Sequence, residues 1–256
     1  MRFSFAWIPL ALLCAHAFAA EEKKPEKKKE PPHIAVVIPF NLIPGETNKI
    51  KIRGLNLTNV SEIRFADSKQ IEAVIKSRGK AEVPKEADVK KWGDTQLEVE
   101  VKLPPEIPTG TNSFTMVSPE GESEPRLVAI TSRGSLLMEK EPNGSFKQAQ
   151  AVEISKTVQG TVAEPKDVDV FRFEGKHGQQ LVVEVVASRY GSLLDPVLTL
   201  YDAHGHIIVS VDDVGESNDA MLRATLPADG NYFISVIDAN DRGGQAYNYN
   251  LLVRVK

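Results

Sequence analysis

Alternation of apolar and polar side chains predicts β-strands along most of this chain. Residues 49–53 read KIKIR and residues 97–102 read LEVEVK. Every second side chain of a strand points to the same face, so each run has one apolar face and one charged face. Prolines and glycines typical of turns separate such runs, as at Pro44-Gly45 and Pro119-Glu120-Gly121. The pattern predicts an all-β protein.

The predicted strands form two sets. Seven extended runs lie between His33 and Thr131, at residues 34–39, 49–53, 61–65, 70–76, 96–102, 113–117 and 126–131. Eight more follow, at residues 159–163, 168–173, 180–187, 197–201, 206–211, 221–226, 232–237 and 247–255. We therefore expect two β-sandwich domains, an immunoglobulin-like one at residues 33–131 and a jelly-roll-like one at residues 137–256. Residues 77–93 form a long insertion, beneath which we expect Trp92 to be partly buried.

The first residues have the pattern of an export signal. Arg2 supplies a positive start, residues 5–18 are almost wholly apolar, and Ala17 and Ala19 are small. We expect a signal peptide at residues 1–19, cleaved after Ala19; the apolar run is short for a membrane span, which makes an uncleaved anchor the less favoured alternative. Cys14 is the only cysteine, so the mature chain would lack disulfides.

Residues 20–32 predict a charged linker. They contain five lysines, four glutamates and three prolines, with no large apolar side chain to bury. A polybasic contact with anionic lipid or cell-wall polymer is the alternative, but the net charge of this segment is only +1. We therefore interpret the segment as a tether.

Charge and motifs argue against two classes of function. Residues 137–256 contain 17 acidic and 11 basic residues, a net charge of −6, which opposes nucleic-acid binding. The chain has no Gly-x-Ser-x-Gly elbow, His-Glu-x-x-His pair, P-loop or dinucleotide fingerprint. His204-Gly205-His206 has the pattern of a hairpin turn with no third ligand nearby, so we expect no zinc site there. The sequence predicts a protein that is not an enzyme.

The second set of strands carries an ordered series of short motifs. In chain order these are Glu141-Pro142-Asn143, residues 167–171, Gly178-Gln179, residues 195–202 with Gly205, Asp212-Asp213, residues 230–236 and residues 247–249. The series resembles the bacterial pre-peptidase C-terminal domain, a module attached to many secreted proteases and related to the collagen-binding domains of collagenases. Residues 33–131 resemble the TIG/IPT type of immunoglobulin-like domain, through residues 44–47, residues 52–57, Leu103-Pro104 and Gly110. Domains of that type are mostly spacers or binding platforms.

The first resemblance implies a calcium site. In calcium-binding relatives, the segment before the first strand and an acidic pair entering an early strand supply the ligands, which here would be Glu139, Glu141, Asn143, Asp167 and Asp169. Strand alternation places Asp169 on the face of Phe171 and Phe173, at the edge of the core, where a hard divalent cation would relieve repulsion and desolvation. Gly144 stands where such relatives often have an acidic residue.

Two alternatives compete with these site predictions. Asn143 could simply cap a short helical turn at residues 145–151 while the carboxylates stay in water. The Asp and Asn clusters at residues 212–219 and 238–241 are typical of solvated loops, and we expect no metal there.

Tyrosines are the remaining candidates for ligand contact, because collagen-binding relatives use exposed ones. Tyr247 and Tyr249 share a face with Leu251 and Val253 and belong to the core. Tyr190 is then the best candidate for an exposed contact.

Together these features predict an exported, calcium-stabilised binding module without catalytic activity. It would recognise a protein or polysaccharide in the periplasm, at the cell envelope or outside the cell. One alternative is an accessory or targeting subunit of a separate secreted peptidase or other hydrolase. Another is a purely structural spacer in the envelope.

Overall fold

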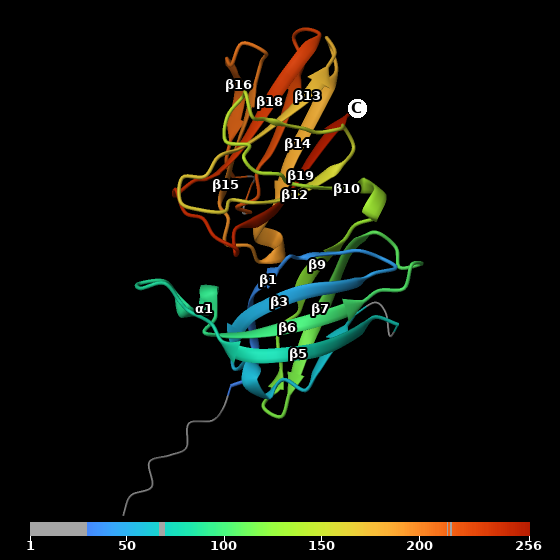
Figure 1. Cartoon of the computed structure of the whole chain (residues 1–256), viewed down its shortest axis with the longest axis vertical. Helices are drawn as coiled ribbons and strands as arrows, with labels where there is room; N and C mark the ends of the chain where they lie inside the picture. Colours follow the sequence, from blue (N-terminus) through green and yellow to red (C-terminus); the bar gives the residue numbers. More distant parts are fainter. Residues whose placement is uncertain (1–29, 67–69, 214, 216) are drawn as a thin grey trace, which may run out of the picture.

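The computed structural model describes residues 30–66, 70–213, 215 and 217–256. The predicted signal peptide and residues 20–29 of the predicted linker lie outside this part of the chain. Figure 1 shows two β-sheet bodies stacked along the long axis, the first in blue to green and the second in yellow to red. This architecture confirms the all-β sandwich class. Within the described residues, no helix is long and apolar enough to cross a membrane.

The first domain, residues 33–131, is built from two sheets. One has the order β1-β3-β6-β5 and the other β2-β9-β7-β4, with β8 beside β7. All seven predicted strands are present. The bounds are His33–Ile38 (β1), Asn41–Leu42 (β2), Thr47–Leu55 (β3), Glu62–Phe65 (β4), Glu72–Lys80 (β5), Thr95–Lys102 (β6), Gly110–Ser118 (β7), Gly121–Glu122 (β8) and Arg126–Ile130 (β9).

The insertion between β5 and β6 contains a single helical turn, α1 (Val89–Trp92). Asp88 caps it by accepting a hydrogen bond from the backbone N–H of Lys90 at 2.9 Å. Trp92 is half-buried, as predicted, but its neighbour is unexpected: its ring centroid lies 6.1 Å from that of Tyr247 in the second domain. The insertion therefore contacts the second domain.

The second domain begins with β10, one residue before the predicted start, and also has two sheets, β10-β12-β19-β14-β17 and β11-β13-β18-β15-β16. All eight predicted strands are present. The bounds are Leu136–Met138 (β10), Gln150–Ala151 (β11), Thr157–Thr161 (β12), Asp169–Gly175 (β13), Gln180–Val186 (β14), Pro196–Tyr201 (β15), Ile207–Val211 (β16), Met221–Thr225 (β17), Gly230–Asp238 (β18) and Asn248–Val255 (β19). Three 3-10 turns complete the described elements, at Leu57–Asn59 (η1), Arg133–Ser135 (η2) and Ser188–Tyr190 (η3).

Period-two alternation accounts for the core of the second domain. Phe171 and Phe173 of β13 and Tyr249 of β19 are all at most 2% exposed. The prediction that Tyr247 and Tyr249 belong to the core is confirmed, since both are buried. Asp169 lies on the same buried face, and it too is fully buried.

Tyr190 corrects a prediction. It was expected to be an exposed ligand contact, but it is only 7% exposed. The turn η3 carries it to the boundary between the domains, where its ring stacks on Phe40 at 4.9 Å between centroids and its hydroxyl lies 2.9 Å from Thr111 Oγ1. The link at residues 188–192 was expected to be a free loop, because its own residues do not indicate that the other domain covers it.

Buried amides also join the two domains. Asn41 Nδ2 donates to Asn250 Oδ1 at 2.5 Å and to Gln159 Oε1 at 3.0 Å, while Asn250 Nδ2 donates back to Asn41 Oδ1 at 3.0 Å. Buried polar groups are costly unless paired, so each domain supplies hydrogen bonds that the other needs. This pairing joins β2 of the first domain to β12 and β19 of the second.

Candidate functional site

The candidate site lies where the chain enters the second domain and crosses its two sheets. β10 pairs in parallel with β12, and the Glu139 backbone N–H continues this ladder by donating to Gln159 O at 3.0 Å. Four residues later, Asn143 O accepts from the backbone N–H of Val170 in β13 at 3.1 Å. Backbone hydrogen bonds therefore attach residues 139–143 to both sheets.

This crossing segment brings three carboxylates together. Glu139, Glu141 and Asp169 each place an oxygen within 4.8 Å of the others. Asn143 lies among them: its backbone N–H donates to Glu141 Oε2 at 2.9 Å and its Nδ2 donates to Glu139 Oε1 at 3.0 Å. We call Glu139, Glu141, Asn143 and Asp169 the crossover site.

Asp167, the fifth predicted ligand, lies outside this group. Its Oδ2 accepts a hydrogen bond from the backbone N–H of Ala163 at 2.7 Å, which closes a turn before β13. The negative charge of Asp167 still acts on the site, because its repulsion is one of the smaller causes that raise the pKa of Asp169. The structure thus brings together four of the five predicted residues.

Two oxygens of the crossover site are buried and have no hydrogen-bond partner. These atoms are Asn143 Oδ1 and Asp169 Oδ1, and both residues are fully buried. Leaving a buried acceptor unpaired costs about 1–3 kcal/mol, and more when the group is charged. Because Asn143 Oδ1 accepts no hydrogen bond, the alternative that this side chain caps a helical turn is wrong. Because Asp169 is fully buried, the alternative that its carboxylate stays in water is wrong as well.

Tyr249 adjoins the crossover site, although the sequence pattern placed it only in the core. Its hydroxyl lies 2.8 Å from Glu139 Oε1 and 2.7 Å from Asp169 Oδ2. Because a hydroxyl carries one proton, it can donate to only one of these carboxylates at a time. A proton on the other carboxyl group completes the second hydrogen bond. Alternation assigned Tyr249 to the core, but no pattern in the chain indicated its partners.

Burial and mutual repulsion keep this group from ionising fully. Burial is the largest cause that raises the pKa of Asp169 to about 9, and the negative charge of Glu139 adds to it. Burial also raises the pKa of Glu139, against the lowering effect of hydrogen bonds from Thr161 and Tyr249. With no cation bound, Asp169 would therefore keep its proton at neutral pH.

The donor set fits a hard divalent cation. Every candidate ligand is a carboxylate or amide oxygen, the type that calcium prefers, and two of these oxygens lack any other partner. No His belongs to the group, which makes it a poor site for zinc. The calcium assignment itself stays a prediction.

The acidic loops differ from their predicted character. Asp219 and Asp238 are each only 2% exposed, so the expectation that these clusters stay in water is wrong for both. Arg189 Nε donates to Asp219 Oδ2 at 2.5 Å, and Arg242 Nε donates to Asp238 Oδ1 at 3.0 Å. Arg189, 30 positions before Asp219, and Arg242, 4 positions after Asp238, neutralise these carboxylates.

Comparison with known proteins supports the resemblance of the second domain. Residues 167–238 match the family model described as bacterial pre-peptidase C-terminal domain. A probable subtilase-type serine protease of Deinococcus radiodurans is 35% identical over 103 residues, which is 39% of this chain and 14% of that protein. The chain thus spans a small part of that relative's length.

Two solved structures are similar to part of the chain. One is the pre-peptidase C-terminal domain of a collagenase from Bacillus anthracis, with 17% identity over 45% of this chain and 100% of that chain, at a TM-score of 0.33. The other is PliG of Aeromonas hydrophila, a periplasmic inhibitor of g-type lysozyme, with 18% identity over 42% of this chain and 96% of that chain, at a TM-score of 0.32.

Proposed function

We propose that this protein is an exported, non-catalytic binding module whose second domain is stabilised by calcium. It would recognise a protein or polysaccharide in the periplasm, at the cell envelope or outside the cell. The observation that carries the calcium proposal is the pair of buried, partnerless oxygens, Asn143 Oδ1 and Asp169 Oδ1, beside the carboxylates of Glu139 and Glu141.

A bound calcium ion would remove the electrostatic cost of this arrangement. Three carboxylates within 4.8 Å repel one another, and Asp169 has no access to water. A divalent cation supplies the missing partner for both unpaired oxygens and favours the ionised form of Asp169. Tyr249 could then donate its proton to one of the two carboxylates, Glu139 or Asp169. The other carboxylate would be neutralised by the ion and would not need a proton of its own.

The same ion would also attach the crossing segment to its sheet. Glu139 and Asn143 belong to the segment that follows β10, whereas Asp169 begins β13. A ligand sphere drawn from both would fix the entry of the chain into the second domain. Since the domains already share buried contacts at Asn41 and Tyr190, the ion would help to hold one interdomain geometry.

The binding role is supported by the family match. Pre-peptidase C-terminal domains are non-catalytic modules of proteases, which favours a binding or accessory role for this chain. The signal-like first residues favour export. An accessory subunit of a separate secreted peptidase is the second candidate, because the matching segment also occurs in a subtilase-type protease.

Thermal unfolding with and without calcium tests the proposal. At a calcium concentration about 100 times its Kd, binding to the native state alone stabilises by about 2.7 kcal/mol, which corresponds to a rise in Tm of roughly 5–10 °C. Asp169→Asn keeps the shape of the side chain but removes the charge, and should abolish the rise.

Asp213→Asn is the matched control, because Asp213 is an exposed acid of the same domain outside the crossover site. It should keep the full calcium response. An unchanged Tm in the wild-type protein would end the calcium proposal. Circular dichroism of the chelated proteins checks that all variants are folded.

Recovery of partners from envelope extract separates the functional alternatives. Immobilised protein that retains an insoluble polysaccharide or an envelope protein supports the binding module, whereas retention of a peptidase supports the accessory subunit. The absence of any retained partner, with and without calcium, would favour the structural spacer.

A further inference from the structure

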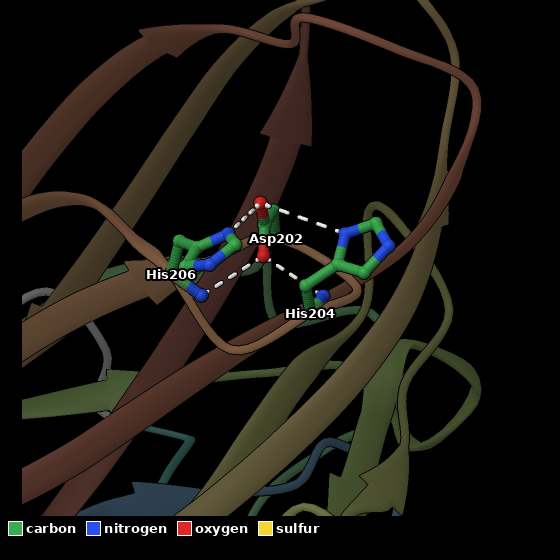
Figure 2. Close-up of side chains that lie close together, drawn as sticks. All are labelled: Asp202, His204 and His206. Carbon is green, nitrogen blue, oxygen red and sulfur yellow. Dashed lines mark hydrogen bonds and ion pairs between the residues drawn. The ribbon is translucent and has the colours of Figure 1, made fainter.

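The hairpin turn between β15 and β16 carries a second group of metal-binding side chains. Asp202, His204 and His206 each offer one ligand atom, and these atoms lie within 4.8 Å of one another. Figure 2 shows the two imidazoles on either side of the carboxylate. No third ligand was expected near the two histidines, and the structure corrects this point, because Asp202 had been named only as the last residue of the motif at residues 195–202.

The backbone of this turn is closed independently of any metal. Gly205 N donates to Asp202 O at 3.1 Å, and Asp202 N donates to His206 O at 3.0 Å. Gly205 has a φ of +83°, a conformation that favours glycine, and a Cβ at this position would lie 3.0 Å from the ring of Phe146. Phe146 also packs on Tyr201 and Phe233, so an aromatic cluster lies against the turn at Gly205.

The carboxylate of Asp202 is divided between two tasks. Its Oδ1 accepts from the backbone N–H groups of His204 at 2.8 Å and His206 at 2.9 Å. These hydrogen bonds orient the side chain and hold Oδ1 on the backbone of the turn. Its Oδ2 is hydrogen-bonded to His206 Nδ1 at 3.0 Å and lies 3.9 Å from His204 Nδ1, and a bound ion would replace this hydrogen bond.

These distances suit a shared metal ion. With metal–ligand distances of about 2.0–2.2 Å, ligand atoms in a tetrahedral site lie roughly 3.3–3.6 Å apart, between the two observed values. Both imidazoles are about four-fifths exposed, so small side-chain rotations can bring Nδ1 to the ion without unfolding. Two imidazole nitrogens and one carboxylate oxygen are typical ligands of zinc rather than calcium.

We propose that Asp202, His204 and His206 form a surface site for a divalent transition-metal ion, represented by Zn²⁺. The three side chains supply three ligands, and solvent supplies the fourth. This site is separate from the crossover site in residues and in ligand type, and it does not depend on the calcium proposal.

Zinc titration of purified, tag-free protein in excess calcium tests this proposal. Calorimetry should reveal one zinc equivalent, and the side-chain NMR signals of His204 and His206 should shift together as it binds. Asp202→Asn keeps the acceptor that closes the turn but loses the charged ligand, and should weaken binding at least about tenfold. A His204→Asn, His206→Asn double variant should lose that equivalent.

His177→Asn is the matched control, because His177 is also an exposed histidine in a turn of the same domain. It should bind zinc as the wild-type protein does. The proposal is overturned if the double variant retains the zinc equivalent, or if the signals of His204 and His206 do not move. The three histidines are exposed and Asp202 is half-buried, and circular dichroism checks that all variants are folded.

Discussion

The crossover site and the turn at residues 202–206 differ in how their ligands are assembled. Asp169 comes from β13, about thirty residues after Glu139, and the two meet only when the sheets have formed. Asp202, His204 and His206 fall within five consecutive residues. An ion at the crossover site therefore requires the native fold, whereas the unfolded chain keeps much of the zinc ligand set together. Only the first kind of site strongly links metal binding to folding.

Burial separates the two sites as well. Asp169 and Asn143 are fully buried and have unpaired oxygens, while both imidazoles of the turn are about four-fifths exposed. Without an ion, the crossover site leaves polar atoms without partners, whereas the ligands of the turn are simply hydrated. The difference predicts that ion removal harms the fold at one site and has little effect at the other.

The largest expected effect is the pH dependence of the chelated protein. Because the pKa of Asp169 is raised to about 9 in the native state, its native form binds more protons than the unfolded form. The stabilisation linked to protonation of Asp169 is therefore fully present below the unfolded pKa of about 4. The free energy of unfolding then falls as pH rises towards 9, by at most about 1.4 kcal/mol per pH unit. Urea unfolding at several pH values between 5 and 9 measures this slope.

Asp169→Asn provides the control for that experiment, because an amide does not ionise in this range. The variant should lose the decline that the wild-type protein shows in chelator, and calcium should suppress the same decline in the wild-type protein. Equal slopes for both chelated proteins would mean that Asp169 is not the group responsible.

A smaller effect is expected for Glu141→Gln. Glu141 is exposed, so its charge acts on a bound divalent ion through water, where a carboxylate 4 Å from the ion is worth about 2 kcal/mol, or roughly thirtyfold in Kd. Calorimetric calcium titration should therefore show a loss of no more than this size for Glu141→Gln and a larger one for Asp169→Asn. Similar losses for both variants would contradict the role assigned to burial.

The smallest effect is expected from zinc on thermal stability. At zinc and calcium concentrations that are equal multiples of their Kd values, zinc should raise Tm by less than about 2 °C, because the unfolded chain also binds zinc through its local ligands. Differential scanning calorimetry of the wild-type protein with each ion measures both shifts. A zinc shift as large as the calcium shift would remove the distinction between local and distant ligands.

Local patterns predicted the strands because the two-residue repeat is a property of each strand by itself. Fifteen predicted runs correspond to strands of the structure, and Asp169 falls on the buried face that alternation assigned to it. The ligand set of the crossover site, in contrast, was predicted from a family resemblance. One predicted ligand, Asp167, lies outside the site, because its carboxylate closes a turn with Ala163 and no local pattern indicates this contact.

Contacts between distant residues were beyond such patterns. Tyr249 reaches Glu139 across 110 positions, and Asn250 reaches Asn41 across 209 positions. Tyr190 was expected in solvent because its own link gives no sign of the domain that covers it. Asp202 was overlooked for another reason: it lies close in sequence to the histidines, but the direction of a turn depends on backbone conformation that the residue types do not specify.

The amino-acid sequence by itself determined the all-β class, the fifteen longer strands and the buried face of those strands whose side chains alternate, because side-chain alternation acts over neighbouring residues. Tertiary structure alone decided which oxygens converge at the crossover site, which of them remain unpaired, and which tyrosine is hidden between the domains. The physical reason is that burial and unpaired hydrogen-bonding groups are properties of packed sheets, and sheet packing joins residues whose separation along the chain carries no local signal.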